Sequence, residues 1–533
     1  MSRLRLYMQG VASNYVTMAA AIVYSLISVP LALNFIGKEQ FGLWALLTQI
    51  ASYMWLIDLG MSPSVGRLLI EHKDRPDGGA YGSLMQTGFL VTAVQGALAL
   101  VAGLALASPL SYLLRIPPDL HVTFCALVRW QSVITAAMFG TRMFRNVLYA
   151  HQRNDLVNYI QAASSLMGIV TLWLMLHWHG GVLSILWSNA SALLFAVLVG
   201  WWTCMRLRLL PPSGAWSRPS WQKFKEMFGY GKDVFVVQAG SFLIGATQSI
   251  IVSRSLGLEA VAAWSVGTKV FFLLSSLIYQ AFDLSTPALS EMMVRGEHER
   301  LRKRFTEMVV VSQILSGVAA IIYAVCNSAF VSVWTHDRIT WSAWNDVLLG
   351  GWMVVSVLIH ANSGFVVLTK RLAGLRYIYL LEGVVFVIGA SLVTPSGGLP
   401  AMIGISLLCG LCFSGAYGIW RINKYFQFRL LDLQRLWLSK LGRICAFLVP
   451  AAIVICWVTT SLSNLNRLIL NAAVVGGLGG YLFFRSGIPP DLRAEILHHV
   501  PQPLRRFLEK LVAGPTAATK KPDAEVDSPR PFR

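Results

Sequence analysis

Long apolar runs alternate with short polar breaks along most of the chain. In the stretch IGKEQFGLWALL, residues 36–47, a break of four residues, 37–40, separates two such runs. A transmembrane helix needs about 20 consecutive, mostly apolar residues. The pattern therefore predicts an all-α polytopic membrane protein with fourteen spanning helices. The predicted spans are 11–36, 40–61, 81–108, 120–141, 155–177, 181–204, 233–253, 258–283, 305–331, 345–368, 374–394, 399–420, 441–460 and 467–485.

The distribution of Lys and Arg gives an independent test of this topology. Positive residues favour cytoplasmic loops, and a missed span would invert the pattern beyond it. With the N-terminus in the cytoplasm, 28 Lys and Arg fall in predicted cytoplasmic segments, among them Arg142, Arg145 and Arg153 after the fourth span. We expect both termini to be cytoplasmic. The predicted external residues are five: Lys38, Arg115, Arg254, Arg338 and Arg467.

Composition agrees with a lipid solvent. The 533 residues are 55% hydrophobic and 13% charged, against about 25% charged residues in soluble chains. The net charge of +19 is spread over every predicted cytoplasmic loop, where membrane insertion and anionic lipids explain it. A nucleic-acid surface would concentrate the charge on one domain, so we expect no nucleic-acid partner. The seven cysteines lie within or near apolar runs, and their odd number argues against a disulfide scaffold.

The chain contains a weak internal repeat at an offset of about 220 residues. FIGKEQFGLW, residues 35–44, aligns with SLGLEAVAAW, residues 255–264. DLGMSP, residues 58–63, resembles DLSTP, residues 283–287, and a third match follows in the same order. An offset of six spans predicts a parallel repeat, related by an axis along the membrane normal. The identities in the first match are Gly37 with Gly257, Glu39 with Glu259 and Trp44 with Trp264.

The repeat predicts two pseudo-symmetric six-helix lobes around a central cleft, with helices 13 and 14 outside the repeat. The C-terminal part reads as two short amphipathic helices on the inner membrane surface, followed by a Pro-, Lys-, Asp- and Ala-rich tail that we expect to be disordered. The predicted divisions are a first lobe at 1–210, a cytoplasmic linker at 211–232, a second lobe at 233–420, helices 13 and 14 at 421–485, an interfacial segment at 486–513 and a disordered tail at 514–533.

The stretch SLISVPLALNFIGKEQFGLWALLTQIASYMWLIDLGMSPSVGR, residues 25–67, resembles the start of Wzx-type flippases of the multidrug/oligosaccharidyl-lipid/polysaccharide exporter superfamily. LYAHQRND, residues 148–155, resembles the family's loop after helix 4. The resemblance implies a bacterial inner-membrane protein that flips an undecaprenyl-pyrophosphate-linked oligosaccharide outward for surface polysaccharide synthesis. It implies a lipid-linked oligosaccharide and membrane lipids as partners, with a polysaccharide polymerase and chain-length proteins as further candidates. No strict motif of the family can be transferred residue by residue.

Two cations lie well inside predicted spans, one in each predicted lobe: Arg129 and Lys269. A charged side chain at mid-helix costs about 2.5–3.5 kcal/mol on insertion scales, unless it faces a watery cavity or a partner. The repeat places Lys269 where the first copy has Gln49. A lipid pyrophosphate carries about two negative charges, which two cations in a cleft would suit. The alternative is that each cation pairs with a neighbouring helix or snorkels to an interface.

Other polar residues in the spans are weaker candidates. Asp58 and Asp283 are candidate gates, although each also fits a turn at a helix end. Glu382 is the deepest carboxylate and a candidate for carrying a coupling proton, or for an ion pair. Asn14, Gln49 and Gln238 are candidates for binding substrate, although helix–helix hydrogen bonds explain most such residues.

Two other functions compete with flipping. A cation-coupled multidrug exporter would share the lobes but needs an anionic site, and the first predicted helix has no Asp or Glu. A membrane glycan polymerase or glycosyltransferase usually has a sizeable external loop, and the largest ones predicted here, 109–119 and 332–344, are short. The sequence shows no metal-ligand cluster, nucleophile–base pair or Gly-rich phosphate loop. We therefore expect a transporter with no covalent chemistry, no cofactor and no metal.

Overall fold

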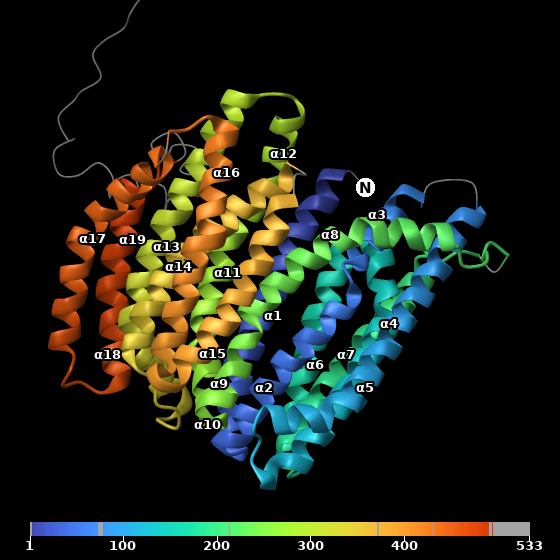
Figure 1. Ribbon diagram of the computed structural model, residues 1–533, viewed down its shortest axis with the longest axis horizontal. Helices are drawn as coiled ribbons and strands as arrows, with labels where there is room; N and C mark the ends of the chain where they lie inside the picture. The colour runs from blue at the N-terminus through green and yellow to red at the C-terminus, as the bar shows by residue number, and fades with distance from the viewer. Residues whose placement is uncertain are drawn as a thin grey trace, which may run out of the picture.

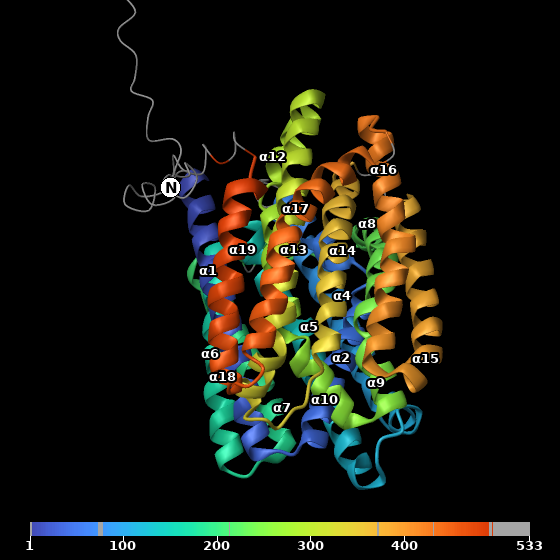
Figure 2. The same ribbon diagram turned by 90° about the vertical axis from the view of Figure 1, so that its left-hand side faces the viewer.

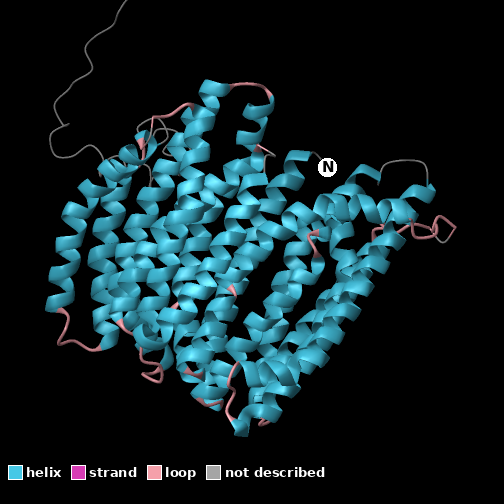
Figure 3. Ribbon diagram, in the orientation of Figure 1, coloured by secondary structure: helices cyan, strands magenta, loops and turns pink. Residues whose placement is uncertain are grey.

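The computed structural model describes residues 3–72, 78–212, 214–369, 373–429, 431–489 and 493, and within them every regular element is a helix (Figures 1 and 3). Twelve helices in these residues are long and apolar enough to cross a membrane. The protein is therefore a multi-pass membrane protein, as its hydropathy pattern predicts.

Two local features explain why twelve helices correspond to fourteen predicted spans. The predicted span 40–61 is divided: an α-helix of 17 residues, Lys38–Met54, is followed by a 3₁₀ helix, Trp55–Asp58, and then by a break at Leu59 and Gly60, which have φ of +50° and +69°. The predicted spans 374–394 and 399–420 follow each other without a long loop and meet at Gly398, whose backbone is not helical (φ +64°, ψ −156°), and together they count as one of the twelve. A Cβ on Gly389 would lie 3.1 Å from Ile405 Cγ1, so the parts before and after Gly398 pack side by side.

The described residues of the first lobe form nine helical elements. They are α1 (Arg3–Phe35), α2 (Lys38–Met54), η1 (Trp55–Asp58), α3 (Met61–His72), α4 (Gly78–Leu113), α5 (Pro118–Ala150), α6 (Asn154–His177), η2 (Gly181–Leu183) and α7 (Ser184–Arg206).

The second lobe follows with ten elements in its described residues, and it carries the additional helices on its outer side. They are α8 (Trp221–Gly245), α9 (Thr247–Leu256), α10 (Leu258–Gly267), α11 (Lys269–Asp283), α12 (Thr286–Val294), α13 (His298–Thr335), α14 (Ala343–Leu368), α15 (Ala373–Gly410), η3 (Leu411–Gly415) and α16 (Ala416–Phe426).

The last helices pack on one side of the second lobe. Figure 2 shows α17 and α19 beside α13, and residues of both pack in one hydrophobic cluster with α13. The last elements are α17 (Asp432–Val458), α18 (Asn464–Asn471), η4 (Ala472–Gly476), α19 (Gly477–Leu482) and η5 (Phe483–Gly487). Most of the predicted interfacial segment 486–513 and all of the predicted tail 514–533 lie outside the described residues.

Helix α8 joins the two lobes. It runs diagonally across the molecule in Figure 1, from the outer side of α3 to the second lobe. At its start, Ser220 N donates to Thr87 Oγ1 at 3.0 Å, and Lys223 Nζ donates to the carbonyl of Ala80. At its end, Gly240 comes so close to the backbone of Tyr379 in α15 that a Cβ would lie 2.8 Å from Leu380 N. The predicted linker is thus partly a helix that contacts both lobes.

The hydrophobic core is shared at one end of the molecule and divided at the other. A single cluster combines residues of α1, α2 and α5 with residues of α10, α11 and α13. Beyond it, one separate cluster holds α3, α4 and the end of α5, and another holds α12, α16 and the start of α13. The lobes therefore make a common core at the end that carries α10 and the start of α2. In the predicted topology this end faces the cell exterior.

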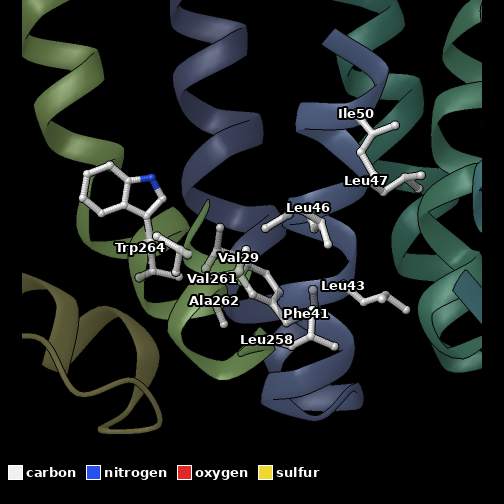
Figure 4. Packing of buried hydrophobic residues seen from close by; sticks show 14 of the residues in the cluster. Val29, Phe41, Leu43, Leu46, Leu47, Ile50, Leu258, Val261, Ala262 and Trp264 are labelled. Atoms are coloured by element: carbon white, nitrogen blue, oxygen red, sulfur yellow. The ribbon is translucent and has the colours of Figure 1, made fainter. Parts of the chain in front are cut away.

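The repeated hairpins themselves make the contact at the joined end. Phe41 of α2 packs against Leu258 and Val261 of α10 (Figure 4). A Cβ on Gly42 would overlap the backbone oxygen of Leu258 and lie 2.8 Å from its carbonyl carbon. Gly257 makes the tight turn into α10 with φ +87°, which side chains other than glycine rarely adopt. Two segments that the internal repeat makes equivalent thus close the molecule against each other.

Candidate functional site

A pocket of about 160 Å³ lies next to the contact between α2 and α10, between the two lobes. Its walls come from α1 and α2 of the first lobe and from α8 to α11 of the second. Its lining residues are Val29, Phe41, Trp44, Ala45, Thr48, Gln49, Gly245, Gln248, Ser249, Trp264, Ser265, Thr268, Lys269 and Phe272.

The pocket is built around the internal repeat. Ten of its fourteen lining residues form five pairs, and the two members of each pair occupy equivalent positions in the two copies. When equivalent residues of both copies line the same pocket, that pocket lies on the pseudo-symmetry axis between the lobes. The repeat detected in the sequence thus relates the walls of this pocket as well as the two lobes. The pairs are Val29 with Ser249, Trp44 with Trp264, Ala45 with Ser265, Thr48 with Thr268, and Gln49 with Lys269.

Lys269 breaks the symmetry of this pocket. Its side chain is exposed, and it makes no hydrogen bond or ion pair with the described part of the chain. The equivalent side chain, Gln49, is neutral and half-buried, and Thr48 and Gln248 add further hydrogen-bonding groups. An ammonium in a ring of amides and hydroxyls can bind an anionic group that also carries hydroxyls.

A break in the helix positions Lys269. Helix α10 ends at Gly267 and α11 begins at Lys269, with Thr268 between them. The carbonyl of Gly267 accepts hydrogen bonds from Tyr323 Oη at 3.0 Å and from Asn327 Nδ2 at 2.9 Å, both on α13. The second lobe therefore stabilises the break with side chains.

Asp346 of α14 in turn orients this network. It is fully buried, and its Oδ1 accepts from Asn327 Nδ2 at 2.7 Å and from Trp341 Nε1 at 2.6 Å. The Trp341 ring lies over Gly267, where a Cβ would overlap it. Three side chains thus meet at Gly267, two positions before Lys269, and Asp346 links two of them, Asn327 and Trp341.

Replacing Asn327 with leucine should destabilise the protein and impair transport together. The change leaves Asp346 Oδ1 with one fewer donor and the Gly267 carbonyl with one fewer, which costs about 1–3 kcal/mol. Thermal unfolding in detergent and a transport assay would measure the two effects. Ser316→Ala is the control, because this buried hydroxyl on the same helix donates only within α13, to Gln313 O. Unchanged unfolding in Asn327→Leu would contradict the assigned role.

The other predicted cation, Arg129, does not line this pocket. Its side chain is exposed on α5 and makes no hydrogen bond or ion pair with the described residues. Asn14 is exposed on α1, and Gln238 is half-buried on α8; neither lines this pocket. Of the five predicted binding residues, the structure therefore brings together Lys269 and Gln49.

The three predicted coupling or gating acids lie in separate places. Asp58 is buried at the break between α2 and α3, and its Oδ1 is 2.9 Å from Arg142 Nη1. Asp283 ends α11, and its Oδ1 is 2.9 Å from Nε2 of His360. Glu382 is buried in α15, where its Oε2 accepts from the backbone N–H of Ser414 at 3.0 Å.

Sequence reasoning missed several residues around the pocket. Thr48, Thr268 and Ser249 could have been found by extending the alignment of the two copies beyond the identities. The network of Tyr323, Asn327 and Asp346 gives no comparable signal, because its members meet only through the packing of α11, α13 and α14.

The chain matches the family model described as "Polysaccharide biosynthesis protein" over residues 8–293. No curated protein sequence matches it.

Solved structures share the fold. The chain is similar to a multidrug resistance MATE family transporter of the MOP superfamily in its inward-facing conformation, with TM-score 0.66, 12% identity, and 78% of this chain and 99% of that chain covered. It is also similar to the lipid II flippase MurJ in an inward closed conformation, with TM-score 0.61, 10% identity, and 90% and 99% covered. An outward-facing MATE transporter matches with TM-score 0.55, 12% identity, and 81% and 96% covered.

These identities are low, so the structural matches establish the architecture, and the family model establishes the relationship by sequence. The predicted resemblance to the flippases of this superfamily is confirmed. Because the family model covers more than half of the 533 residues, the chain belongs to the polysaccharide biosynthesis protein family, and its fold is that of the MOP superfamily.

Proposed function

We propose that the protein flips an undecaprenyl-pyrophosphate-linked oligosaccharide from the inner to the outer leaflet of the bacterial cytoplasmic membrane. The product would be delivered outside to a polysaccharide polymerase and its chain-length proteins. The family match and the fold shared with transporters and a flippase support the general class.

The observation that carries the proposal is the unpaired cation in the pocket between the lobes. Lys269 lies among neutral amides and hydroxyls, and none of the fourteen lining residues is acidic. A pyrophosphate taken out of water needs a compensating positive charge, since burial of unpaired charge is costly. Amides and hydroxyls can satisfy the hydroxyl groups of a sugar. The pocket therefore suits the polar group of a lipid-linked sugar.

The division of the hydrophobic core supports alternating access. The lobes share one core at the predicted external end and have separate cores at the other end. Rocking of one lobe against the other would separate the hairpins and expose the pocket outside. The Lys269 pocket lies next to this contact, so a small rotation of the lobes would switch its access between the two sides of the membrane.

A multidrug exporter remains the alternative with the same fold. Export of cationic compounds requires an anionic site, yet the pocket between the lobes carries a lysine and no acid. Glu382, the acid that favours this alternative, does not line the pocket and accepts a hydrogen bond from Ser414. The charge of the pocket therefore favours an anionic substrate.

Deletion of the gene in its native host tests the proposal. Lipid-linked oligosaccharide should accumulate on the cytoplasmic side, surface polysaccharide should be lost, and re-expression of the chain should restore it. Efflux of a cationic dye should be unchanged. Normal surface polysaccharide together with lost dye efflux would contradict the flippase function and favour the multidrug exporter.

A further inference from the structure

A second pocket, of about 310 Å³, lies inside the first lobe. Helices α5, α6 and α7 form its walls, and Trp55 of η1 closes one side. It shares no lining residue with the Lys269 pocket. The sequence pattern placed Arg142 and Arg145 in a cytoplasmic loop, whereas α5 continues to Ala150 and both arginines line this pocket.

The two arginines face a single carboxylate. Arg142 Nη1 lies 2.9 Å from Asp58 Oδ1, and its guanidinium carbon is 4.8 Å from the centroid of the Trp55 ring. Arg145, one turn later on the same face of α5, is exposed and makes no ion pair or hydrogen bond with the described residues. The pocket thus carries one positive charge that the described chain does not compensate.

Arg142 itself has unused hydrogen-bonding capacity. Its Nε–H is buried and has no partner among the described residues. A guanidinium fork binds phosphate with two parallel hydrogen bonds, so a phosphate beside Arg142 and Arg145 would satisfy this orphan donor and the free charge together.

The remaining lining residues suit a polar headgroup attached to an apolar chain. Asn189 and Gln161 bring amide side chains that hydrogen-bond with none of the described residues, and Ile134, Met138 and Leu193 are apolar. Arg142 lies eight residues before the end of α5, or about 12 Å at a helical rise of 1.5 Å per residue. This places the arginines near the predicted cytoplasmic membrane surface, where basic pockets between helices bind lipid headgroups.

Asp58 acts as an internal counter-ion that a ligand would replace. Besides Arg142, its carboxylate accepts from Ser62 N at 3.2 Å and Ser62 Oγ at 2.5 Å, so it retains partners when Arg142 leaves. These bonds span the break at Leu59 and Gly60. A ligand that replaces Asp58 at Arg142 would therefore change the contacts at the break between α2 and α3. Residues of α2 line the Lys269 pocket.

We propose that this first-lobe pocket binds a phosphate-bearing lipid headgroup through Arg142 and Arg145, in competition with Asp58. The headgroup belongs either to a polyprenyl phosphate carrier or to an anionic phospholipid. The proposal does not rest on the proposed flipping activity.

Binding to the full-length protein in phosphatidylcholine nanodiscs tests the proposal. The probes are undecaprenyl phosphate, phosphatidylglycerol and inorganic phosphate, with lipid binding followed by native mass spectrometry and phosphate by thermal shift. Arg145→Gln should weaken lipid binding about tenfold or more, because a charge-assisted contact is lost. Arg145→Lys, which keeps the charge, should weaken it less. Asp58→Asn should strengthen binding, because it removes the competing anion.

Arg206→Gln is the matched control, since this exposed arginine on α7 lies over Trp202 and does not line the pocket. Its lipid affinity should equal that of the wild type. Undecaprenyl phosphate alone would identify the carrier as the ligand, and binding of both lipids would identify anionic headgroups in general. Wild-type affinity in Arg145→Gln, weaker binding in Asp58→Asn, or binding of inorganic phosphate without either lipid would overturn the proposal.

The same variants separate this inference from the proposed function. Arg145→Gln should weaken lipid binding by the same factor in the Lys269→Ala background as in the wild type, because the two residues line different pockets. If Lys269→Ala flips normally, the proposed role of the central pocket fails while the first-lobe site stands. If Arg145→Gln binds normally, the first-lobe site fails whatever the transport assay shows.

Discussion

Replacement of Lys269 by alanine should abolish flipping while leaving the protein in the membrane at its normal level. Lys269 has no ion pair or hydrogen bond among the described residues, so its removal breaks neither. The anionic substrate, by contrast, would lose its compensating charge. Bound substrate would cover Lys269 and bury the charge pair, and truncating one partner of a buried charge pair costs about 2–5 kcal/mol, which at 1.4 kcal/mol per tenfold change is about 30-fold to several thousand-fold. Flipping by purified protein in liposomes and surface polysaccharide in cells are the measurements.

Two further variants separate charge from general disturbance. Lys38→Ala removes an exposed lysine at the start of α2, outside the pocket, and should flip normally. The double variant Gln49→Lys with Lys269→Gln moves the cation to the equivalent position in the other lobe and should recover part of the activity. Normal surface polysaccharide in Lys269→Ala would remove Lys269 from the mechanism.

The repeat explains why the sequence could indicate the central pocket. It aligns Gln49 with Lys269, and the structure places both on the wall of one pocket. The hydropathy pattern predicts the helices, and the internal repeat predicts the symmetry that relates the lobes. Together they predict which positions lie near the pseudo-symmetry axis. Neither gives the rotation of a helix about its own axis, so neither shows that Arg129, about nine residues into its predicted span, does not line the same pocket.

The first-lobe pocket shows where the pattern misleads. The pattern predicts that the fourth span ends at residue 141, whereas α5 continues beyond it to Ala150. Arg142 is tolerated inside the helix because Asp58, 84 positions earlier, supplies a partner and Trp55 supplies a ring face. A partner so far along the chain leaves no local signal, and the same holds for Asn327 and Asp346 around the break at Gly267.

Gly42→Ala should shift the protein away from the conformation described here and slow flipping. A methyl group at this position would overlap the backbone oxygen of Leu258, and backbone cannot rotate away as a side chain can. The helices α2 and α10 would have to separate, at a cost of about 1–3 kcal/mol for overpacking. This contact joins the lobes, so the cost falls only on the state in which this end is closed. A change confined to one state moves the equilibrium between the two states, here by about 5- to 150-fold.

Spin labels at Glu39 and Glu259 would report this shift, because these exposed residues occupy equivalent positions in the two hairpins. In a cysteine-free background, the distance distribution between the labels should lengthen in Gly42→Ala. Gly37→Ala is the matched control: it lies in the same hairpin, has φ −69°, and a Cβ there would have no atom within 4 Å. Equal distances in Gly42→Ala and the wild type, or an equal shift in both variants, would contradict the closing role of the hairpins. Lengthening in Gly42→Ala alone would show that the contact of Gly42 with Leu258, between the two equivalent hairpins, sets the balance between the two states.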